Sequence, residues 1–180
     1  MSRITRPLRV GIIGTGGIAG QHIDGYKKAE DVELVAACDV IESRAIGMKE
    51  KHGFQTHFTS WEEMIKHADL DAVSVCTPPF AHLEPTIGAL EAGLHVLCEK
   101  PMALDSAQAQ TMVDAWHKVR ETKGNLFSVG FQSRYGKNAQ QLKRFIDAGE
   151  LGDVYYVRAA YLRRRGVPAW GVFTSKELNG

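Results

Sequence analysis

Two short stretches of this sequence combine residue types whose spacing could support chemistry: a glycine-rich run near the amino terminus and a Glu-Lys-Pro triplet near residue 100. The first, Val10-Gly-Ile-Ile-Gly-Thr-Gly-Gly-Ile-Ala19, fits the spacing G-x-G-x-x-A. In such a run the first glycine permits a tight turn, the second lets the backbone approach a pyrophosphate, and the alanine lets a helix pack against a strand. The N–H groups at the start of that helix also attract phosphate. The predicted dinucleotide-binding residues are Gly14, Thr15, Gly16, Gly17 and Ile18.

An acid follows the second predicted strand. Asp39 lies roughly 25 residues beyond the first glycine, where a carboxylate accepts hydrogen bonds from the adenosine ribose hydroxyls. The same charge would repel a 2′-phosphate, and Val40 and Ile41 supply no basic group, so we expect NAD as the cofactor and NADP as less favoured. Arg44 could reach a 2′-phosphate, although an arginine at such a place is more often a solvated helix residue. An aspartate after a strand is also a common turn former.

Further candidates follow the fourth predicted strand, in the segment Cys76-Thr-Pro-Pro-Phe-Ala-His82. Ligands of open parallel sheets bind outside the carboxyl ends of the strands. We therefore expect Thr77 and Pro78 to form a stiff wall beside the cofactor. Three interpretations of His82 stay open: it caps the next helix, lines the pocket and contacts the cofactor, or is exposed.

The triplet Glu99-Lys100-Pro101 follows the fifth predicted strand. The amine of Lys100 could hold a substrate hydroxyl, and its charge would favour alkoxide character at that oxygen. The alternative is a surface lysine on a turn. We expect the Lys100–Pro101 peptide bond to be cis, because a tight turn must direct the lysine back over the cleft.

Composition excludes several classes of function. The net charge is +1, which creates no general attraction for nucleic acid or membrane surfaces, and no apolar run reaches the roughly 18 residues that cross a bilayer. Neither the three cysteines nor the seven histidines have metal-ligand spacing, so we expect no metal site. Cys38, Cys76 and Cys98 each end an apolar run and are expected to be buried, reduced thiols of a cytoplasmic protein.

Short β-rich runs alternate with amphipathic stretches, which indicates βαβ units and a parallel sheet. The expected strands are 8–13, 32–38, 55–58, 71–76, 94–98 and 126–129. The expected helices are 18–28, 43–52, 61–67, 82–91, 105–119 and 136–148, with Ser60 and Glu63 forming a capping box. This pattern predicts an α/β fold with a Rossmann-type, doubly wound parallel sheet in an NAD-binding domain over residues 1–130. Val154–Leu162 is expected to be the first strand of a second sheet, in an incomplete substrate and oligomerisation domain over 131–180.

Taken together, these motifs resemble the glucose–fructose oxidoreductase/inositol dehydrogenase (Gfo/Idh/MocA) family over essentially the whole chain. The resemblance rests on Gly14–Ala19, Cys38-Asp39, Thr77-Pro78 with His82, Ala92-Gly-Leu-His-Val-Leu-Cys-Glu-Lys-Pro101 and Gly130-Phe-Gln-Ser-Arg134. It implies NAD(P)-dependent oxidation or reduction of a sugar, cyclitol or related polyol, and a homo-oligomer when the protein is full length. Lys100 would match the family's catalytic lysine, Glu99 and Lys100 would contact the cofactor, and Gln132 and Arg134 would lie on the substrate side.

Family members are about twice as long, and their catalytic aspartate and histidine follow a glycine-rich stretch. This sequence ends at Leu178-Asn-Gly180, so we expect it to be an amino-terminal fragment that lacks the general base. Two other functions remain open. One is a glycosidase of similar fold in which held NAD transiently oxidises the sugar, and the other is a non-catalytic NAD-binding module.

Overall fold

A six-stranded parallel sheet forms the centre of the fold in the computed structural model, which describes residues 6–162, 164, 166 and 174–179. The strand order is β3-β2-β1-β4-β5-β6, so the order reverses between β1 and β4. The bounds are β1 Leu8–Ile13, β2 Val32–Cys38, β3 Thr56–Phe58, β4 Ala72–Val75, β5 His95–Cys98 and β6 Phe127–Val129. All six predicted strands are present, and the predicted Rossmann-type doubly wound sheet is confirmed.

The connections between the strands are mostly helical, as the alternating pattern predicts. In this part of the chain the helices are α1 Ala19–Tyr26, α2 Glu42–His52, α3 Trp61–His67, α4 Leu83–Ala92 and α5 Ser106–Lys123, with a short 3₁₀ helix η1 at Pro79–Ala81. The predicted end of α5 at Val119 is wrong by one turn. The helix continues to the left-handed Gly124 (φ +67°), where the chain can turn without a Cβ clash.

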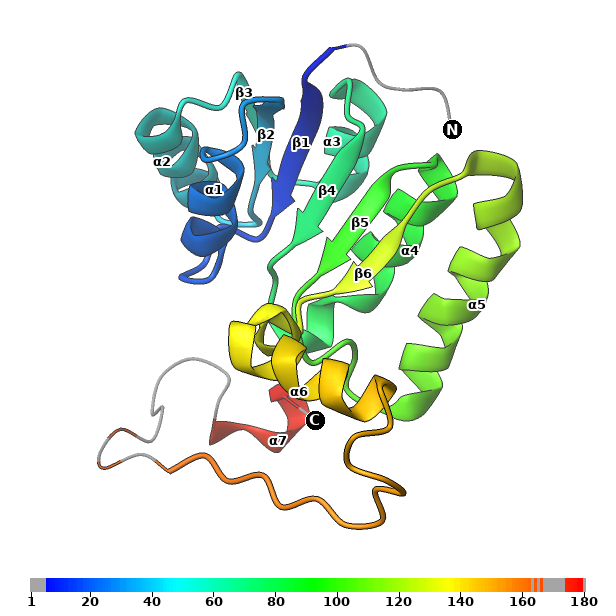
Figure 1. Ribbon diagram of the computed structural model, residues 1–180. Coiled ribbons are helices and arrows are strands. Elements are labelled where there is room, and N and C mark those ends of the chain that lie inside the picture. Colours follow the sequence, from blue (N-terminus) through cyan, green and yellow to red (C-terminus); the bar gives the residue numbers. More distant parts are fainter. Residues whose placement is uncertain (1–5, 163, 165, 167–173, 180) are drawn as a thin grey trace. The chain divides into compact units, whose positions relative to one another are not determined.

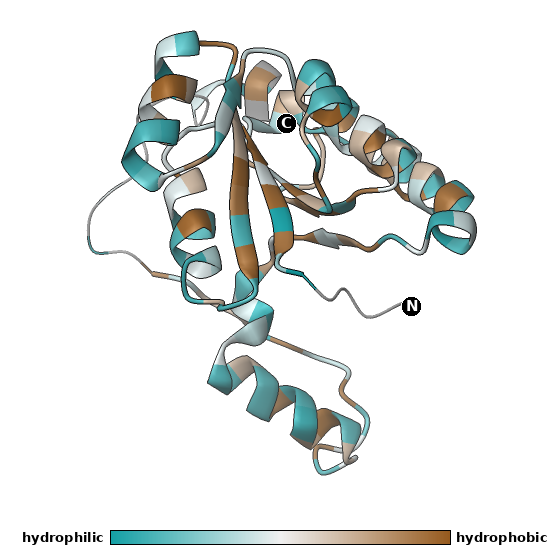
Figure 2. Cartoon of the chain, turned by 90° about the horizontal axis from the view of Figure 1, so that it is seen from above, coloured by the Kyte–Doolittle hydropathy of each residue, from teal (hydrophilic) through white to brown (hydrophobic). Residues whose placement is uncertain are grey.

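Helices cover the sheet on both faces, and two hydrophobic clusters fill the layers between them (Figure 1). On one face, Ile12 and Ala37 of the sheet pack with Ile23 of α1 and residues of α2. On the other, strand residues pack with α3, α4 and α5, around Met64, Leu90 and Met112. Figure 2 shows the apolar strands in brown between helices whose outer faces are largely teal. Because both faces are covered, the strands are apolar along most of their length.

Side chains that accept backbone N–H bonds begin two of these helices. The hydroxyl of Ser60 accepts the N–H of Glu63 (3.1 Å), and the carboxylate of Asp105 accepts the N–H of Gln108 (2.8 Å). The cap at Ser60 is confirmed, but the reciprocal half of the capping box is not formed, because the Glu63 carboxylate pairs with His67 at 3.0 Å. These caps define where α3 and α5 start.

The described residues fall into two compact units, and the division lies after Gly130. The first unit holds the sheet and also the residues from Ser175, including α7 (Lys176–Asn179); the second spans residues 131–174. The second unit contains a 3₁₀ helix η2 (Gln132–Tyr135) and α6 (Lys137–Asp147). That residues 131–180 begin a substrate and oligomerisation domain remains a prediction.

The predicted strand over Val154–Leu162 is wrong for this structure. The segment has no regular secondary structure, and Tyr155 (98% exposed) and Leu162 (92%) are almost fully accessible. A strand needs a neighbouring strand to satisfy its N–H and C=O groups, and among the described residues this segment is not one of the six strands of the sheet. Within the described residues, no helix is both long and apolar enough to span a bilayer.

Candidate functional site

Three loops begin at neighbouring positions on the carboxyl edge of the sheet. The strand register places Ile13 beside Cys38 and Val75, and Val75 beside Cys98. The glycine turn after β1, the loop after β4 and the Glu-Lys-Pro turn after β5 therefore start side by side, at the reversal in strand order where open α/β sheets bind ligands.

The glycine turn has one side closed by protein and another side open. Gly14 has φ +87° and donates its N–H to the carbonyl of Cys38 (2.8 Å); a Cβ on Gly14 would lie 2.7 Å from the backbone nitrogen of Thr77. A Cβ on Gly16 or Gly17 would meet nothing within 4 Å. The turn thus fits closely against the β4 loop and leaves space above its second and third glycines, which fits a pyrophosphate.

Asp39 is bonded mainly to this turn. Its Oδ2 accepts both the backbone N–H of Thr15 (2.9 Å) and the Thr15 hydroxyl (2.8 Å), while Oδ1 accepts the N–H of Ile41 (3.0 Å). Because each carboxylate oxygen offers two lone pairs, Oδ1 keeps one acceptor position. The contact with a ribose hydroxyl remains a prediction, and the structure adds that Asp39 holds the glycine turn to the end of β2.

His82 is buried at 1% exposure, so the interpretation of an exposed side chain is wrong. Its Nδ1 lies 2.8 Å from the carbonyl oxygen of Pro101, and its Nε2 lies 2.8 Å from that of Thr77. The side chain makes no helix-capping bond. With both ring nitrogens bonded to backbone, His82 ties the β4 loop to the turn after β5, and its contact with a cofactor stays untested.

The Thr77 hydroxyl bonds within the same loop, to the carbonyl of Ala81 (2.8 Å). Pro78 has extended backbone and leads directly into η1. Their predicted role beside the cofactor also remains a prediction.

Glu99 and Lys100 face different surroundings. Glu99 is buried, and its Oε1 accepts a hydrogen bond from Nε2 of His22 (2.9 Å) while its Oε2 accepts the backbone N–H of Lys100 (3.1 Å). The side chain of Lys100 is exposed, and the Lys100–Pro101 bond is cis, as predicted. Lys100 therefore lies at the carboxyl edge of the sheet, and its backbone N–H is held by the buried carboxylate of Glu99.

A polar network below this turn was missed by sequence reasoning. Nδ1 of His22 lies 3.1 Å from the hydroxyl oxygen of Ser74, which is 2.6 Å from the hydroxyl oxygen of Tyr26. Burial raises the pKa of Tyr26, although the bond to Ser74 acts to lower it. Two signals could have revealed the network: a serine within the apolar strand Ala72–Val75, and His22 and Tyr26 one turn apart on the face of α1 toward the sheet.

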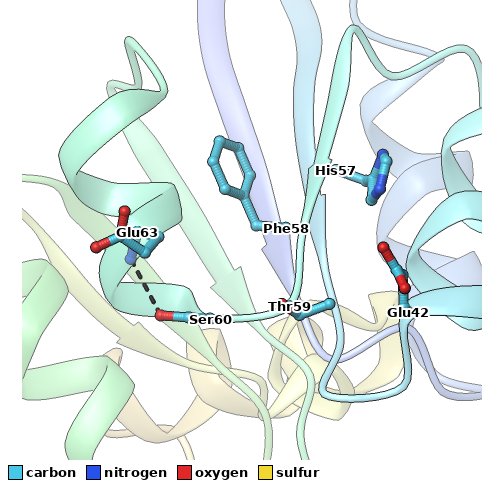
Figure 3. Close-up of a pocket in the computed structure, with 6 residues that line it drawn as sticks. All are labelled: Glu42, His57, Phe58, Thr59, Ser60 and Glu63. Carbon is cyan, nitrogen blue, oxygen red and sulfur yellow. Dashed lines mark hydrogen bonds between the residues drawn. The ribbon is translucent and has the colours of Figure 1, made fainter.

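A pocket of about 240 Å³ lies at the carboxyl end of β3, close to Asp39, whose N–H donates to the carbonyl of Phe58 (3.2 Å). Figure 3 shows His57 and Glu42 on one side of this strand end and Phe58 on the other. The lining residues are Glu42, His57, Phe58, Thr59, Ser60 and Glu63. The pocket was not expected from sequence, and its lining includes two carboxylates, of which that of Glu63 pairs with His67.

Two predicted substrate residues lie outside this unit. Gln132 and Arg134 belong to η2 of the second unit and are exposed, and their role in a substrate pocket remains a prediction. Across the described parts of the chain, no three His, Cys, Asp or Glu side chains lie close enough to hold a metal ion.

Comparison with characterised proteins gives relatives over most of the chain. It is 43% identical over 175 residues to D-glucoside 3-dehydrogenase of Escherichia coli, covering 97% of the chain and 49% of that protein. It is 30% identical over 165 residues to inositol 2-dehydrogenase of Salmonella typhimurium, covering 91% of the chain and 48% of that protein. The chain spans about half the length of the curated relatives it matches.

Solved structures agree with these relatives. Scyllo-inositol dehydrogenase of Lactobacillus casei, with bound NAD(H) and scyllo-inositol, matches with a TM-score of 0.72 at 31% identity, over 82% of this chain and 43% of that one. The WlbA dehydrogenase of Bordetella pertussis, in complex with NADH and UDP-GlcNAcA, matches with a TM-score of 0.75 at 30% identity, over 83% and 45%. The model of the oxidoreductase family with an NAD-binding Rossmann fold matches residues 8–131. The chain therefore belongs to the Gfo/Idh/MocA oxidoreductase family and carries its NAD-binding Rossmann domain.

Proposed function

We propose that the protein to which this chain belongs is an NAD-dependent dehydrogenase of a sugar, cyclitol or related polyol, in which Lys100 holds the reacting hydroxyl. The observation that carries the proposal is the exposed Lys100 at the carboxyl edge, on the turn that starts abreast of the glycine turn. The names of the relatives support the substrate class, because they include a glucoside dehydrogenase and inositol dehydrogenases.

The residues present fit NAD. The open space above Gly16 and Gly17 suits the pyrophosphate, and the remaining acceptor position of Asp39 suits a ribose hydroxyl. Negative charge on Asp39, with Glu42 three residues later at the start of α2, would repel a 2′-phosphate. This charge supports NAD over NADP.

Bound NAD supplies the chemistry of such an enzyme by accepting a hydride from the carbon that bears the hydroxyl. The part of Lys100 is to donate a hydrogen bond from its ammonium group to that hydroxyl and to stabilise negative charge as it develops on the oxygen. Family resemblance implies that the general base is a histidine outside these residues, so we assign Lys100 the positioning and electrostatic role only.

The test uses the full-length protein with a panel of sugars and cyclitols and follows NADH absorbance. Lys100→Ala should lower kcat by about 10²–10³-fold, far more than it weakens NAD binding, whereas Lys118→Ala, at an exposed position on α5, should change neither. Unchanged turnover of Lys100→Ala would contradict the proposal. Release of a sugar without net NADH would favour the glycosidase, and NAD binding without turnover of any polyol would favour a binding module.

The 180-residue chain should bind NAD and oxidise none of these polyols at a measurable rate. The reason is that Lys100 would have no general base beside it, and general acid–base help is typically worth about 10²–10⁴-fold. The measurement compares NADH production by this chain with that by the full-length protein. Comparable rates would show that the residues described here suffice for turnover.

A further inference from the structure

We propose that two histidines with mostly buried side chains clamp the Lys100 turn from its two sides, and that this clamp holds Lys100 against the nicotinamide half of the cofactor. Residue 99, before the lysine, is held by His22, and residue 101, after it, is held by His82. The lysine itself is exposed. The proposal rests on the proposed function, because it assumes that NAD binds at this edge.

The first side of the clamp is His22 with Glu99, in a cluster where each polar group has a hydrogen-bond partner. His22 and Glu99 each have a side chain only 9% exposed, so the carboxylate needs the hydrogen bond from Nε2 of His22. When Nε2 carries the ring proton, Nδ1 can accept the hydroxyl of Ser74, which can accept that of Tyr26, and each of these groups has a partner. The other carboxylate oxygen of Glu99 is then free to accept the N–H of Lys100.

Gly130 leaves little room for Glu99 to move. A Cβ at residue 130 would lie only 3.0 Å from Oε1 of Glu99, and the N–H of Gly130 donates to the carbonyl of Cys98 (2.8 Å). The carboxylate therefore lies between α1 and the residue that follows β6, in a position its neighbours define. A carboxylate with such a fixed position is suited to orient the backbone of Lys100.

The second side of the clamp is His82, at the start of α4. Its Nε2 and Nδ1 each lie 2.8 Å from a carbonyl oxygen, of Thr77 and Pro101 respectively, and a ring nitrogen that carries a proton donates to the carbonyl it faces. The ring thereby couples the loop that abuts Gly14 to the turn that presents Lys100. One histidine from α1 and one at the start of α4 thus hold the residues immediately before and after Lys100.

The geometry gives opposite expectations for amide substitutions at the two histidines. An asparagine amide reaches about as far as Nδ1, and a glutamine amide about as far as Nε2. His22→Gln retains a donor for Glu99, and His22→Asn does not. At the other histidine the order reverses, because His82→Asn retains the donor for Pro101 and His82→Gln retains only the one for Thr77.

The experiment titrates NAD and ADP into the 180-residue chain by calorimetry, since ADP carries the adenosine end without the nicotinamide end. His22→Asn and His82→Gln should weaken NAD binding by about tenfold or more and leave ADP binding unchanged, while His22→Gln and His82→Asn should lie close to the wild type. His117→Asn and His117→Gln, at an exposed position on α5, should match the wild type for both ligands.

Thermal unfolding of each variant shows whether it is folded, and if His22→Asn is not, the His82 pair still carries the comparison. Parallel weakening of NAD and ADP, or the same order of Asn and Gln at both positions, would overturn the clamp. Wild-type affinity for NAD in all four variants would also overturn it while leaving the proposed function intact. A wild-type chain that binds neither ligand would overturn both proposals.

Discussion

At the scale of single residues, the site depends on carboxylates that are already hydrogen-bonded within the protein. Asp39 spends three of its acceptor positions on the backbone and hydroxyl of Thr15 and the backbone of Ile41. Glu99 is used in the same way by His22 and by Lys100. Acidic side chains predicted to contact a ligand therefore also hold the loops that form the site.

Replacing Asp39 should affect both cofactor binding and folding. Asp39→Ala removes the partner of the buried Thr15 N–H, so we expect NAD binding and the free energy of unfolding each to fall by about 1–3 kcal/mol. Asp39→Asn keeps an acceptor but loses the charge, so it should bind NADP better relative to NAD. Calorimetry and urea unfolding measure these effects, and Asp31→Ala, exposed at the other end of β2, is the control. Equal or tighter NADP binding by the wild type would contradict the role of this charge.

At the scale of elements, the glycines in the turn between β1 and α1 meet two different requirements, one for folding and one for cofactor binding. Gly14 must be glycine for the fold, because its φ is +87° and backbone atoms of the β4 loop occupy the place of a Cβ. Gly16 has open space instead, and the requirement predicted there is the close approach of a cofactor. The same turn therefore contains one structural and one predicted binding position.

Alanine at these two glycines should give opposite results. Gly14→Ala should lower the free energy of unfolding by about 2–4 kcal/mol, from left-handed backbone strain and overpacking against Thr77. Gly16→Ala should change stability little and weaken NAD binding by about tenfold or more, because its Cβ enters the space predicted for the pyrophosphate. Urea unfolding and NAD titration on both variants make the comparison. Full NAD affinity in Gly16→Ala would exclude a close approach of the cofactor there.

The amino ends of β1 and β4 are joined by a charged cluster that should respond to acid. Burial alone would raise the pKa of Asp71, but hydrogen bonds from the Arg6 side chain and the Arg9 N–H outweigh it and hold this pKa below its usual value. A group with a lowered folded pKa stabilises the fold above its unfolded pKa, about 3.9 for Asp, and loses that contribution as pH falls through the folded value.

Asp71→Asn should therefore destabilise the protein most above pH about 5, and the difference from wild type should shrink toward pH 3. Urea unfolding at several pH values measures it. Asp114→Asn, at an exposed site on α5, should show a small difference at every pH. A constant difference for Asp71→Asn across this range would mean that its charge contributes nothing.

At the scale of the whole molecule, all three cysteines lie at or just beyond strand ends inside the two hydrophobic layers. Cys38, Cys76 and Cys98 are free and buried, as predicted. Burial raises the pKa of the Cys38 and Cys98 thiols to about 12, with nearby carboxylates adding to the effect, and burial also raises the pKa of Cys76. A thiol reacts as its thiolate, so these groups report on opening of the core.

In the native chain, all three thiols should react with a disulfide reagent at pH 8 far more slowly than a free cysteine. In denaturant, three should react at once. The measurement is thiol release followed by absorbance. Rapid reaction of any one of them in the native chain would show that its strand end is accessible without unfolding.

The sequence alone was enough for features that depend on neighbouring residues. The strand runs, the cap at Ser60, the glycine turn and the cis Lys100–Pro101 bond were all predicted, because hydrophobic pattern, capping chemistry and turn geometry are local. The doubly wound parallel sheet followed from the alternation of strands and helices. The strand predicted over Val154–Leu162 failed because a strand also requires a partner, which is not a local property.

Only the tertiary structure decided which side chains meet. Thr15 and Asp39 are 24 residues apart, His22 and Glu99 are 77 apart, and His82 and Pro101 are 19 apart. These pairs form because the reversal of strand order places β1 beside both β2 and β4, with β5 next to β4, which brings α1 close to the turn after β5. Sequence spacing carries no record of that neighbourhood, so the residues that hold Lys100 in place could be found only once the sheet was assembled.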